Sequence, residues 1–405
     1  MKILYIDGDG PLGGASRSLY ELVSHLKPLG VKPYILVTRG TVVPYYSEIA
    51  EEISTTYGLT RFDNTKYSHY RGVRWLIVLR ELLRLPSTLK SIYKAYKTWK
   101  EIDLIHVNEL TEIVPAVIAK KLFKIPIVVH SRSLFWNEPS AMRFKWIKRM
   151  VLKHIDLIIP IDESVEATLP KEFNTFVVHN SFTPKYAKTS DNQFIQKIDN
   201  LRKDTFKVGF VGNLLHGKGL IEIIEAAKIL KERKIKVDII IVGDEIRSIK
   251  GLKALILKSI GLSQSLKSEM IQKINEYKLE ESIHLMGSTY DIQPIYERFD
   301  VLCFPSHFDA PGRPIFEAAF SGIPSIAAIN NPKPDTFIHL GTGMAIPPRD
   351  HIKLADAIEY MAKNPEHTKQ MGINAKELAV KNFTPSTNAK QVFEQYNKLL
   401  NKKHN

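Results

Sequence analysis

Two acidic residues, a basic residue and a glycine lie within one short stretch near residue 310. Asp309 and Glu317 have seven residues between them, and Gly312 and Arg313 lie in that interval. The apolar run before them predicts a buried strand, and the residues after it predict a helix that Gly322 ends. Backbone N–H groups at a helix N-terminus, with an arginine beside them, attract phosphate. The stretch therefore predicts a site for a ligand with both phosphate and hydroxyl groups, such as a nucleotide sugar.

A second glycine-bearing turn lies about a hundred residues earlier, at residues 207–220 (KVGFVGNLLHGKGL). Gly212 and Asn213 follow a predicted strand, and Lys218 and Gly219 precede a predicted helix. The start of that helix is again an anion site, and the lysine would add positive charge against a diphosphate.

Histidines end two apolar runs in the first half of the chain. His130 ends the run at residues 126–129, and His106 ends the preceding one, with Asn108 and Glu109 after it. Polar residues at the carboxyl ends of parallel strands face the ligand side of such a sheet. We expect His130 to line a site there, although a lone histidine can equally be structural.

These residues are positioned by a pattern that alternates strand and helix along the whole chain. The predicted strands of the first half are residues 3–6, 34–37, 104–107, 126–129, 156–160 and 175–178, and those of the second half are 206–212, 237–242, 283–286, 300–304, 324–328 and 343–346. The pattern predicts an α/β protein with two doubly wound, Rossmann-like domains facing a cleft. The expected division is a first domain at 1–180, a polar linker at 181–205, a second domain at 206–384 and a C-terminal helix at 385–405.

Length and composition agree with a two-domain globular protein of 405 residues. The single cysteine, Cys303, lies in an apolar run, so no disulfide framework is expected. With no signal peptide and no apolar run long enough to span a bilayer, we expect a cytoplasmic protein. The net charge of +14 favours an anionic partner. No RNA- or DNA-binding motif supports a nucleic acid in that role.

The first turn of the chain, GDGPLGG, admits another interpretation. Gly8, Gly10 and Gly13 match the dinucleotide-binding spacing, and Arg39 could hold the 2′-phosphate of NADP. An NADP-dependent oxidoreductase therefore stays open. The D-x-D at residues 7–9 is interpreted as part of the turn, and no metal is predicted.

Two basic stretches with aromatic residues lie in the first half, at residues 61–100 and 141–154. Basic amphipathic helices of this kind are typical of membrane-surface binding. They predict peripheral docking on an anionic membrane; in the alternative interpretation, the apolar stripe packs on the sheet and the charges are solvated.

The pattern P-S-x-x-(acid)-x7-Glu-A-x-x-x-G-x-P at residues 305–324 resembles the donor-binding signature of retaining glycosyltransferases of family 4, which have the GT-B fold. The segment HLMGSTYD at residues 284–291 resembles the base-binding turn of the same family. The chain departs from the family pattern at Asp309, where the family usually has Glu, at Asn213, where it has Arg, and at Asp335, which replaces a Glu.

The resemblance implies a role for each matching residue. Asp309 would hold sugar hydroxyls, Glu317 the ribose, and His130 the donor sugar at the reaction centre. Charge on the leaving diphosphate would be stabilised by the cationic side chains of Lys218 and Arg313 and by the backbone of the glycine turns. The backbone positions are Gly13, Gly14, Gly212, Gly219 and Gly312, and Asn213 lies beside Gly212.

The nucleobase would meet the backbone of Met286 and Gly287, and Tyr290 would stack on it. The C-terminal helix would cross back to the first domain.

The predicted function is retaining transfer of a hexose from a nucleoside-diphosphate sugar to a hydroxyl acceptor, with no cofactor. The expected acceptor is a sugar or a lipid-linked or surface-polysaccharide precursor. A family member that has lost activity and only binds a membrane or polyanion is the third interpretation left open.

Overall fold

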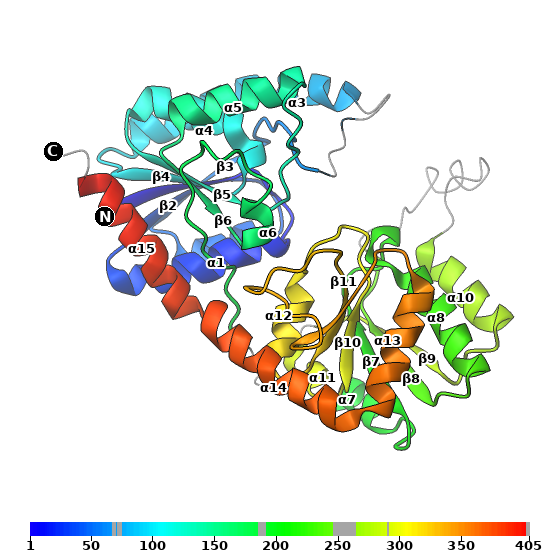
Figure 1. The fold of residues 1–405 in the computed structure, drawn as a ribbon. Coiled ribbons are helices and arrows are strands. Elements are labelled where there is room, and N and C mark those ends of the chain that lie inside the picture. The colour runs from blue at the N-terminus through cyan, green and yellow to red at the C-terminus, as the bar shows by residue number, and fades with distance from the viewer. Residues whose placement is uncertain (67–69, 71–74, 185–191, 246–264, 290, 402–405) are drawn as a thin grey trace. The chain divides into compact units, whose positions relative to one another are not determined.

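The computed structural model describes residues 1–66, 70, 75–184, 192–245, 265–289 and 291–401. The chain divides into two compact units. The first comprises Met1–Thr183 with Phe383–Asn405, and the second comprises Pro184–Asn382. Each unit contains one parallel sheet covered by helices on both faces (Figure 1).

The first unit is built on a sheet that has, among the described residues, six parallel strands in the order β3-β2-β1-β4-β5-β6. Its strands are β1 (Lys2–Asp7), β2 (Lys32–Thr38), β3 (Glu52–Thr56), β4 (Leu104–Val107), β5 (Ile127–Ser131) and β6 (Leu157–Pro160). The central strands are apolar and buried on both faces, as expected for a parallel sheet with helical crossovers.

Helices cover the two faces of this sheet through separate cores. They are α1 (Gly14–Leu26), η1 (Lys27–Leu29), α2 (Val43–Ile49), α3 (Ile77–Thr98), η3 (Leu110–Glu112), α4 (Ile113–Phe123), α5 (Met142–His154), α6 (Glu163–Glu166) and α15 (Pro385–Asn401). Helices α3, α4 and α5 pack on one face, and α1, α2 and α15 pack on the other (Figure 1). The C-terminal helix α15 contributes Ala389, Val392 and Tyr396 to the core that it shares with α1.

The second unit repeats the architecture, with the order β12-β11-β10-β7-β8-β9 among the described residues. Its strands are β7 (Phe206–Val211), β8 (Val237–Val242), β9 (Ile283–Gly287), β10 (Val301–Phe304), β11 (Ser325–Ala328) and β12 (Gly343–Ile346). Its helices are α7 (Asn192–Asp199), η4 (His216–Lys218), α8 (Leu220–Glu232), α10 (Leu266–Glu276), α11 (Gln293–Tyr296), α12 (Arg313–Phe320), α13 (His351–Lys363) and α14 (Pro365–Asn382).

The strand prediction fails at two places in the first unit. Strand β3 was not predicted, because four of the five residues of its sequence EISTT are polar, as suits the edge of a sheet. Residues 175–178 are not a strand, and in the described part of the chain only an isolated bridge joins Thr175 to Ile158. The segment still follows β6, since the Phe176 and Val178 N–H groups donate to its carbonyls.

The prediction of a linker at 181–205 is wrong for its second half. That half contains helix α7, whose Phe194 and Ile198 are buried in the core of the second unit. The pair is spaced one helical turn apart, a signal too short to stand out in a polar segment.

Candidate functional site

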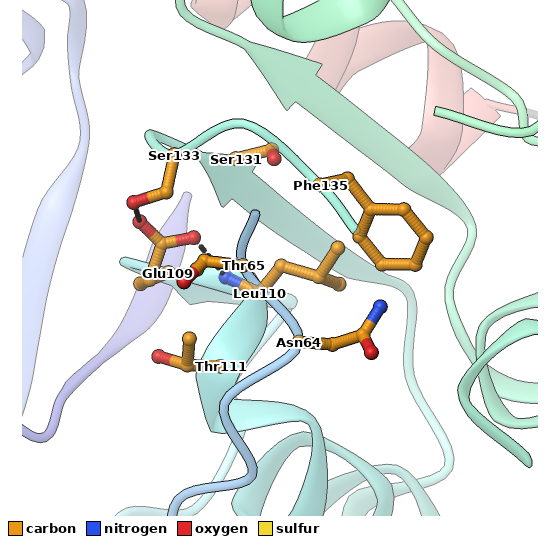
Figure 2. Close-up of a pocket in the computed structure, with 8 residues that line it drawn as sticks. All are labelled: Asn64, Thr65, Glu109, Leu110, Thr111, Ser131, Ser133 and Phe135. Carbon is orange, nitrogen blue, oxygen red and sulfur yellow. Dashed lines mark hydrogen bonds between the residues drawn. The ribbon is translucent and has the colours of Figure 1, made fainter. Parts of the chain in front are cut away.

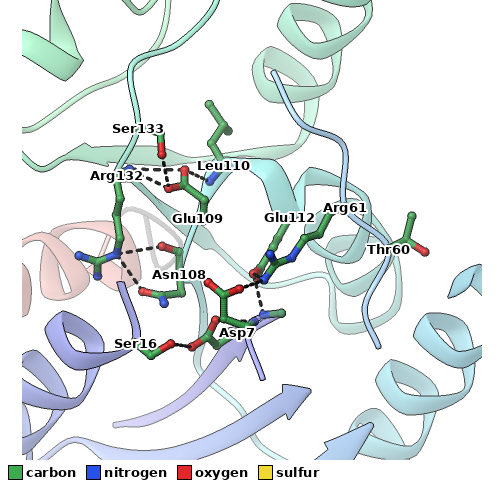
Figure 3. Close-up of polar contacts among 12 residues, drawn as sticks. Asp7, Ser16, Thr60, Arg61, Asn108, Glu109, Leu110, Glu112, Arg132 and Ser133 are labelled. Carbon is green, nitrogen blue, oxygen red and sulfur yellow. Dashed lines mark hydrogen bonds and ion pairs between the residues drawn. The ribbon is translucent and has the colours of Figure 1, made fainter. Parts of the chain in front are cut away.

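Polar side chains gather at the carboxyl edge of the first sheet, where β1, β4 and β5 end (Figure 3). Strand β1 ends in Asp7, β4 is followed by Asn108 and Glu109, and β5 is followed by Arg132. Parallel strands bring their carboxyl ends to one edge, so residues far apart in sequence meet there.

Arg61 joins the acids around the first turn. Its Nη2 lies 2.7 Å from Asp9 Oδ1 and 3.6 Å from Glu112 Oε1. Glu112 Oε1 also accepts the Gly8 N–H at 2.6 Å. Burial raises the pKa of Glu112, and Arg61 opposes that rise. The network holds the first glycine turn in place.

Asp7, the other acid of the D-x-D, is occupied by protein groups. Its carboxylate accepts the Tyr46 hydroxyl at 2.5 Å, the Ser16 hydroxyl at 3.1 Å and the Asp9 N–H at 3.0 Å. Burial raises the pKa of Asp7, and the nearby Asp9 carboxylate raises it further. These contacts agree with the interpretation of the D-x-D as part of the turn; the absence of a metal requirement stays a prediction.

Arg132 organises the next strand ends. Its Nε donates to the carbonyl and side-chain oxygens of Asn108, at 3.1 and 3.0 Å, and its backbone N–H donates to Glu109 Oε2 at 3.2 Å. Glu109 also accepts from the Ser133 hydroxyl at 3.3 Å and from the Leu110 N–H at 2.8 Å. Burial nevertheless raises the pKa of Glu109 to about 7. A proton at this carboxyl is therefore held near neutral pH.

A small pocket opens beside Glu109 (Figure 2). It is lined by Asn64, Thr65, Glu109, Leu110, Thr111, Ser131, Ser133 and Phe135. Its volume of about 10 Å³ has room for one water-sized group. Asn64 Oδ1 and Ser131 Oγ are buried and have no hydrogen-bond partner among the described residues, so the pocket can receive a hydroxyl or a water.

Residue type and spacing did not mark Arg61, Asn64, Glu112 or Arg132 as site residues. The acid Glu112 follows a predicted strand within a few residues, which is the one local signal that could have drawn attention to it. Arg61 and Asn64 come from a loop, and only the tertiary fold brings that loop to the strand ends.

His130 lies at the end of β5, as expected, but its ring is only 3% exposed. Its Nδ1 is 2.6 Å from His106 Nε2, and His106 Nδ1 contacts the Tyr396 hydroxyl of α15. Burial lowers the pKa of both imidazoles, to about 3 for His106, so both are neutral at pH 7. The geometry is that of an ordered, buried pair, and contact of His130 with a donor sugar stays a prediction.

Gly13 and Gly14 begin helix α1 at the same edge. Gly13 is the N-cap residue, and no side chain caps the helix there. A Cβ added at either glycine would meet no atom of the described residues within 4 Å, and both glycines are exposed, so the backbone is open on that side. This open backbone suits the predicted approach of a ligand.

In the second unit, Lys218 and Gly219 lie between β7 and α8. Gly219 has φ +76°, and a Cβ there would lie 2.0 Å from the Pro305 carbonyl oxygen, so only glycine fits. Burial lowers the pKa of Lys218, and its Nζ lies 5.0 Å from the centre of the Phe304 ring. No carboxylate of the described residues forms an ion pair with this lysine. The remaining residues of the turn, Gly212 and the exposed Asn213, precede it.

Helix α12 begins against the same aromatic ring. Gly312 is its N-cap residue, no side chain caps it, and a Cβ there would lie 2.3 Å from Phe304. Phe304 therefore brings the half-buried lysine and an uncapped helix N-terminus together, a combination that attracts an anion.

Both acids of the signature accept hydrogen bonds from protein groups. Glu317 is 8% exposed; one oxygen accepts Arg313 Nε at 2.7 Å and the other accepts the Tyr296 hydroxyl at 2.7 Å. Asp309, at φ +50°, accepts the Asn330 N–H at 2.8 Å. Arg313, predicted to contact phosphate, thus pairs with Glu317 in this structure.

The predicted base-binding residues Met286 and Gly287 are the last two residues of β9. Gly287 has φ +82°, its carbonyl accepts the Gly243 N–H at 2.8 Å, and Met286 packs against the core. Tyr290, predicted to stack on the base, lies outside the described residues.

Two parallel, doubly wound sheets, each with anion-attracting turns at its strand ends, define the GT-B class of glycosyltransferases. The chain matches the model "Glycosyltransferase Family 4" over residues 12–184 and the model "Glycosyl transferases group 1" over residues 191–378. The chain belongs to this family of glycosyltransferases, and the predicted resemblance and fold class are confirmed.

Relatives and solved structures agree with this assignment. The chain is 22% identical to the capsular polysaccharide biosynthesis glycosyltransferase CapM of Staphylococcus aureus over 345 aligned residues. The alignment covers 80% of this chain and 85% of CapM. It is 25% identical, over 61% of its length and 62% of the relative, to the Escherichia coli UDP-Gal:alpha-D-GlcNAc-diphosphoundecaprenol alpha-1,3-galactosyltransferase. HepE from Anabaena in complex with UDP superimposes with a TM-score of 0.74 and 21% identity, covering 98% of this chain and 100% of HepE.

Proposed function

We propose that the protein transfers a hexose, with retention of anomeric configuration, from a nucleoside-diphosphate sugar to a hydroxyl of a surface-polysaccharide or lipid-linked precursor. The observation that carries the proposal is the half-buried Lys218, which forms no ion pair among the described residues and lies beside the uncapped N-terminus of α12, joined to it through Phe304. Relatives named for capsule biosynthesis and for a diphosphoundecaprenol acceptor, and a fold neighbour that binds UDP, support the choice of substrates.

These residues would act mainly by electrostatic stabilisation of the leaving group. As the bond between the anomeric carbon and the diphosphate oxygen breaks, negative charge grows on the leaving diphosphate. Lys218 and the first N–H groups of α12 would stabilise that charge, because burial strengthens their interaction with it. The acceptor oxygen bonds to the anomeric carbon from the same face, and its proton passes to the leaving phosphate. Asp309 would hold sugar hydroxyls during this step.

Glu317 is assigned to the ribose of the donor. Arg313 and Tyr296 hold its carboxylate in one orientation, so its oxygens are ordered before a ligand arrives. We expect Glu317→Gln to lower kcat/KM by roughly a hundredfold or more, because the amide loses the charge that strengthens a hydrogen bond to a hydroxyl. Tyr296→Phe, which removes one support and leaves the carboxylate, serves as the matched control and should cost much less. Unchanged transfer in Glu317→Gln would contradict the assignment.

We also propose that the first unit docks on an anionic membrane surface. The apolar stripe at the start of α3 does not pack on the sheet, so that alternative is wrong for these residues: Leu76, Leu79, Leu82 and Leu83 are each more than half exposed. The opposite side of α3 supplies the core residues Ile92 and Ala95. Residues 67–69 and 71–74 of the stretch lie outside the described residues.

Helix α5 adds basic charge beside further apolar surface. Its sequence contains Arg143, Lys145, Lys148, Arg149 and Lys153 and no acid. Three of its larger apolar side chains are exposed, namely Met142, Trp146 and Leu152. No helix in the described part of the chain is long and apolar enough to cross a bilayer. Peripheral attachment at the cytoplasmic face is the arrangement that we propose.

The first test is thermal unfolding with UDP, GDP, ADP and NADP⁺ in turn, with and without a divalent metal. A ligand at 100 times its dissociation constant adds about 2.7 kcal/mol to the stability of the state that it binds. We expect one nucleoside diphosphate to raise the midpoint without metal. Transfer from the matching nucleotide sugar, with the product anomer assigned by NMR, then tests retention. Binding without transfer would favour the family member that has lost activity, and an NADP⁺ shift alone would favour the oxidoreductase.

A further inference from the structure

A groove of about 580 Å³ lies between α3 and α4 of the first unit. It is lined by Leu89, Lys90, Tyr93, Ile118, Lys121 and Leu122. The two helices belong to the layer that covers one face of the sheet (Figure 1). The volume falls within the range of small-molecule sites.

Packing between the helices forms the groove. Tyr96 of α3 meets Phe123 of α4 edge to face, with ring centres 5.2 Å apart. Leu89 and Tyr93 are about half exposed, at 47% and 52%, so the apolar wall faces outward. Such an open apolar wall gains free energy when an apolar chain covers it.

Positive charge lies along the rim of the groove. Lys90 and Lys121 are among its lining residues, and Lys97 Nζ lies 5.5 Å from the centre of the Tyr93 ring. Within the described residues no acid forms an ion pair with Lys90 or Lys121. These ammonium groups are therefore available to an anionic head group.

We propose that this groove binds one anionic phospholipid of the bilayer, with part of an acyl chain over the apolar wall and the phosphate between Lys90 and Lys121. The proposal rests on the proposed membrane docking and narrows it to a defined lipid site. The groove continues the exposed apolar side of α3, which includes Leu79, Leu82 and Leu83. A second copy of this chain fits less well, because the chain carries a net charge of +14 and the rim is itself basic.

A cysteine reporter can test the site directly. The only native cysteine, Cys303, is fully buried in the second unit, so a new surface cysteine is labelled selectively. Leu89→Cys, carrying an environment-sensitive dye, reports the groove, and Ile271→Cys, a position 44% exposed on α10, serves as the control position. We expect phosphatidylglycerol vesicles, and short-chain phosphatidylglycerol below its micelle concentration, to shift the emission at position 89 only.

Charge variants then separate the groove from general docking. Lys90→Gln with Lys121→Gln should weaken the short-chain lipid response by on the order of tenfold. Lys369→Gln with Lys376→Gln, exposed lysines of α14 that flank the exposed Ile373, should leave it unchanged. Leu79→Gln with Leu83→Gln should weaken vesicle binding but spare the short-chain lipid.

Three outcomes would overturn the lipid site: an equal response to inorganic phosphate or to a zwitterionic lipid, unchanged binding in the Lys90 and Lys121 variant, or a dye shift that tracks self-association in sedimentation. Nucleotide binding and transfer to a soluble acceptor are measured on the same variants. If the parent protein transfers sugar but does not respond to the lipid, only the lipid site is rejected. If the parent protein transfers no sugar, the proposed function is rejected.

Discussion

At the scale of single residues, the glycines of the phosphate-type turns fall into two kinds. At Gly219 a side chain would meet backbone and the torsion angle is left-handed, so the fold itself requires glycine. At Gly13 and Gly14 there is open space, and the fold tolerates a methyl group. Stability and activity can therefore be separated by one substitution at each kind of site.

We expect Gly14→Ala to keep or slightly raise the unfolding midpoint, since alanine favours the start of a helix over glycine. If a ligand approaches this backbone, the same variant should lose transfer activity. Gly219→Ala should instead lower stability, because Pro305 must move. Thermal melts and kcat/KM on both variants provide the comparison. Full activity in Gly14→Ala would show that no ligand needs that open space.

The raised pKa of Glu109 predicts that the stability of the protein depends on pH. Burial raises its pKa from 4.5 to about 7, so the folded protein holds a proton that the unfolded chain releases between those values. The stability from this group is present below the unfolded pKa and is lost as pH rises through the folded pKa. Urea titrations give the free energy of unfolding at each pH. Between about pH 5 and pH 8 this free energy should fall more for the unsubstituted protein (the parent) than for Glu109→Gln. The surface variant Glu366→Gln should follow the parent, and identical curves for parent and Glu109→Gln would refute the shift.

At the scale of elements, α15 stabilises a unit whose sheet and other helices lie more than two hundred positions earlier. Its Tyr396 is fully buried, and the hydroxyl contacts His106 Nδ1 and the Tyr5 hydroxyl, the latter at 3.4 Å. Through His106 the helix also orders His130 at the end of β5.

We expect Tyr396→Phe to destabilise the first unit by about 1–3 kcal/mol, because it leaves a buried imidazole nitrogen without its partner. Tyr360→Phe removes a similar contact, 2.9 Å from His367 Nδ1, on the surface of the second unit and should cost well under 1 kcal/mol. Chemical denaturation measures both, and equal costs would show that burial of the Tyr396 pair contributes nothing.

At the scale of the whole molecule, the two units carry separate natural probes. All four tryptophans belong to the first unit, and the single cysteine, Cys303, is buried in the core of the second. Tryptophan fluorescence therefore follows one unit, and the thiol reactivity of Cys303 follows the other.

If the donor nucleotide binds the second unit, a concentration 100 times its dissociation constant should slow labelling of Cys303 through local unfolding by about a hundredfold. The nucleotide should stabilise the unfolding transition seen by tryptophan fluorescence less than it stabilises the second unit against the opening that exposes Cys303. Labelling by a thiol reagent in low urea, with and without the nucleotide, makes the comparison. A nucleotide that shifted only the tryptophan transition would place its site in the first unit.

Much of the fold followed from the sequence because its signals are local. Buried parallel strands are continuous apolar runs, and those of the second unit, for example Val237–Val242, were predicted within a residue or two. The glycine turns, the signature from Asp309 to Glu317 and the basic stretches were likewise apparent from residue type and spacing. Strand β3 was missed because four of its five residues are polar, and helix α7 was missed because it is short and contains only three apolar residues.

Only the tertiary structure decided which distant groups meet. It brings Arg61 to Glu112 and Tyr396 to His106, pairs Arg313 with Glu317, and leaves the leucines at the start of α3 exposed. Spacing along a helix shows that an apolar stripe exists, but which stripe is buried depends on what packs against it. The sequence by itself determined the class of fold and the chemistry that its turns can support. The tertiary contacts determined which charges are paired and which surface remains for a partner, because both depend on neighbours that are remote along the chain.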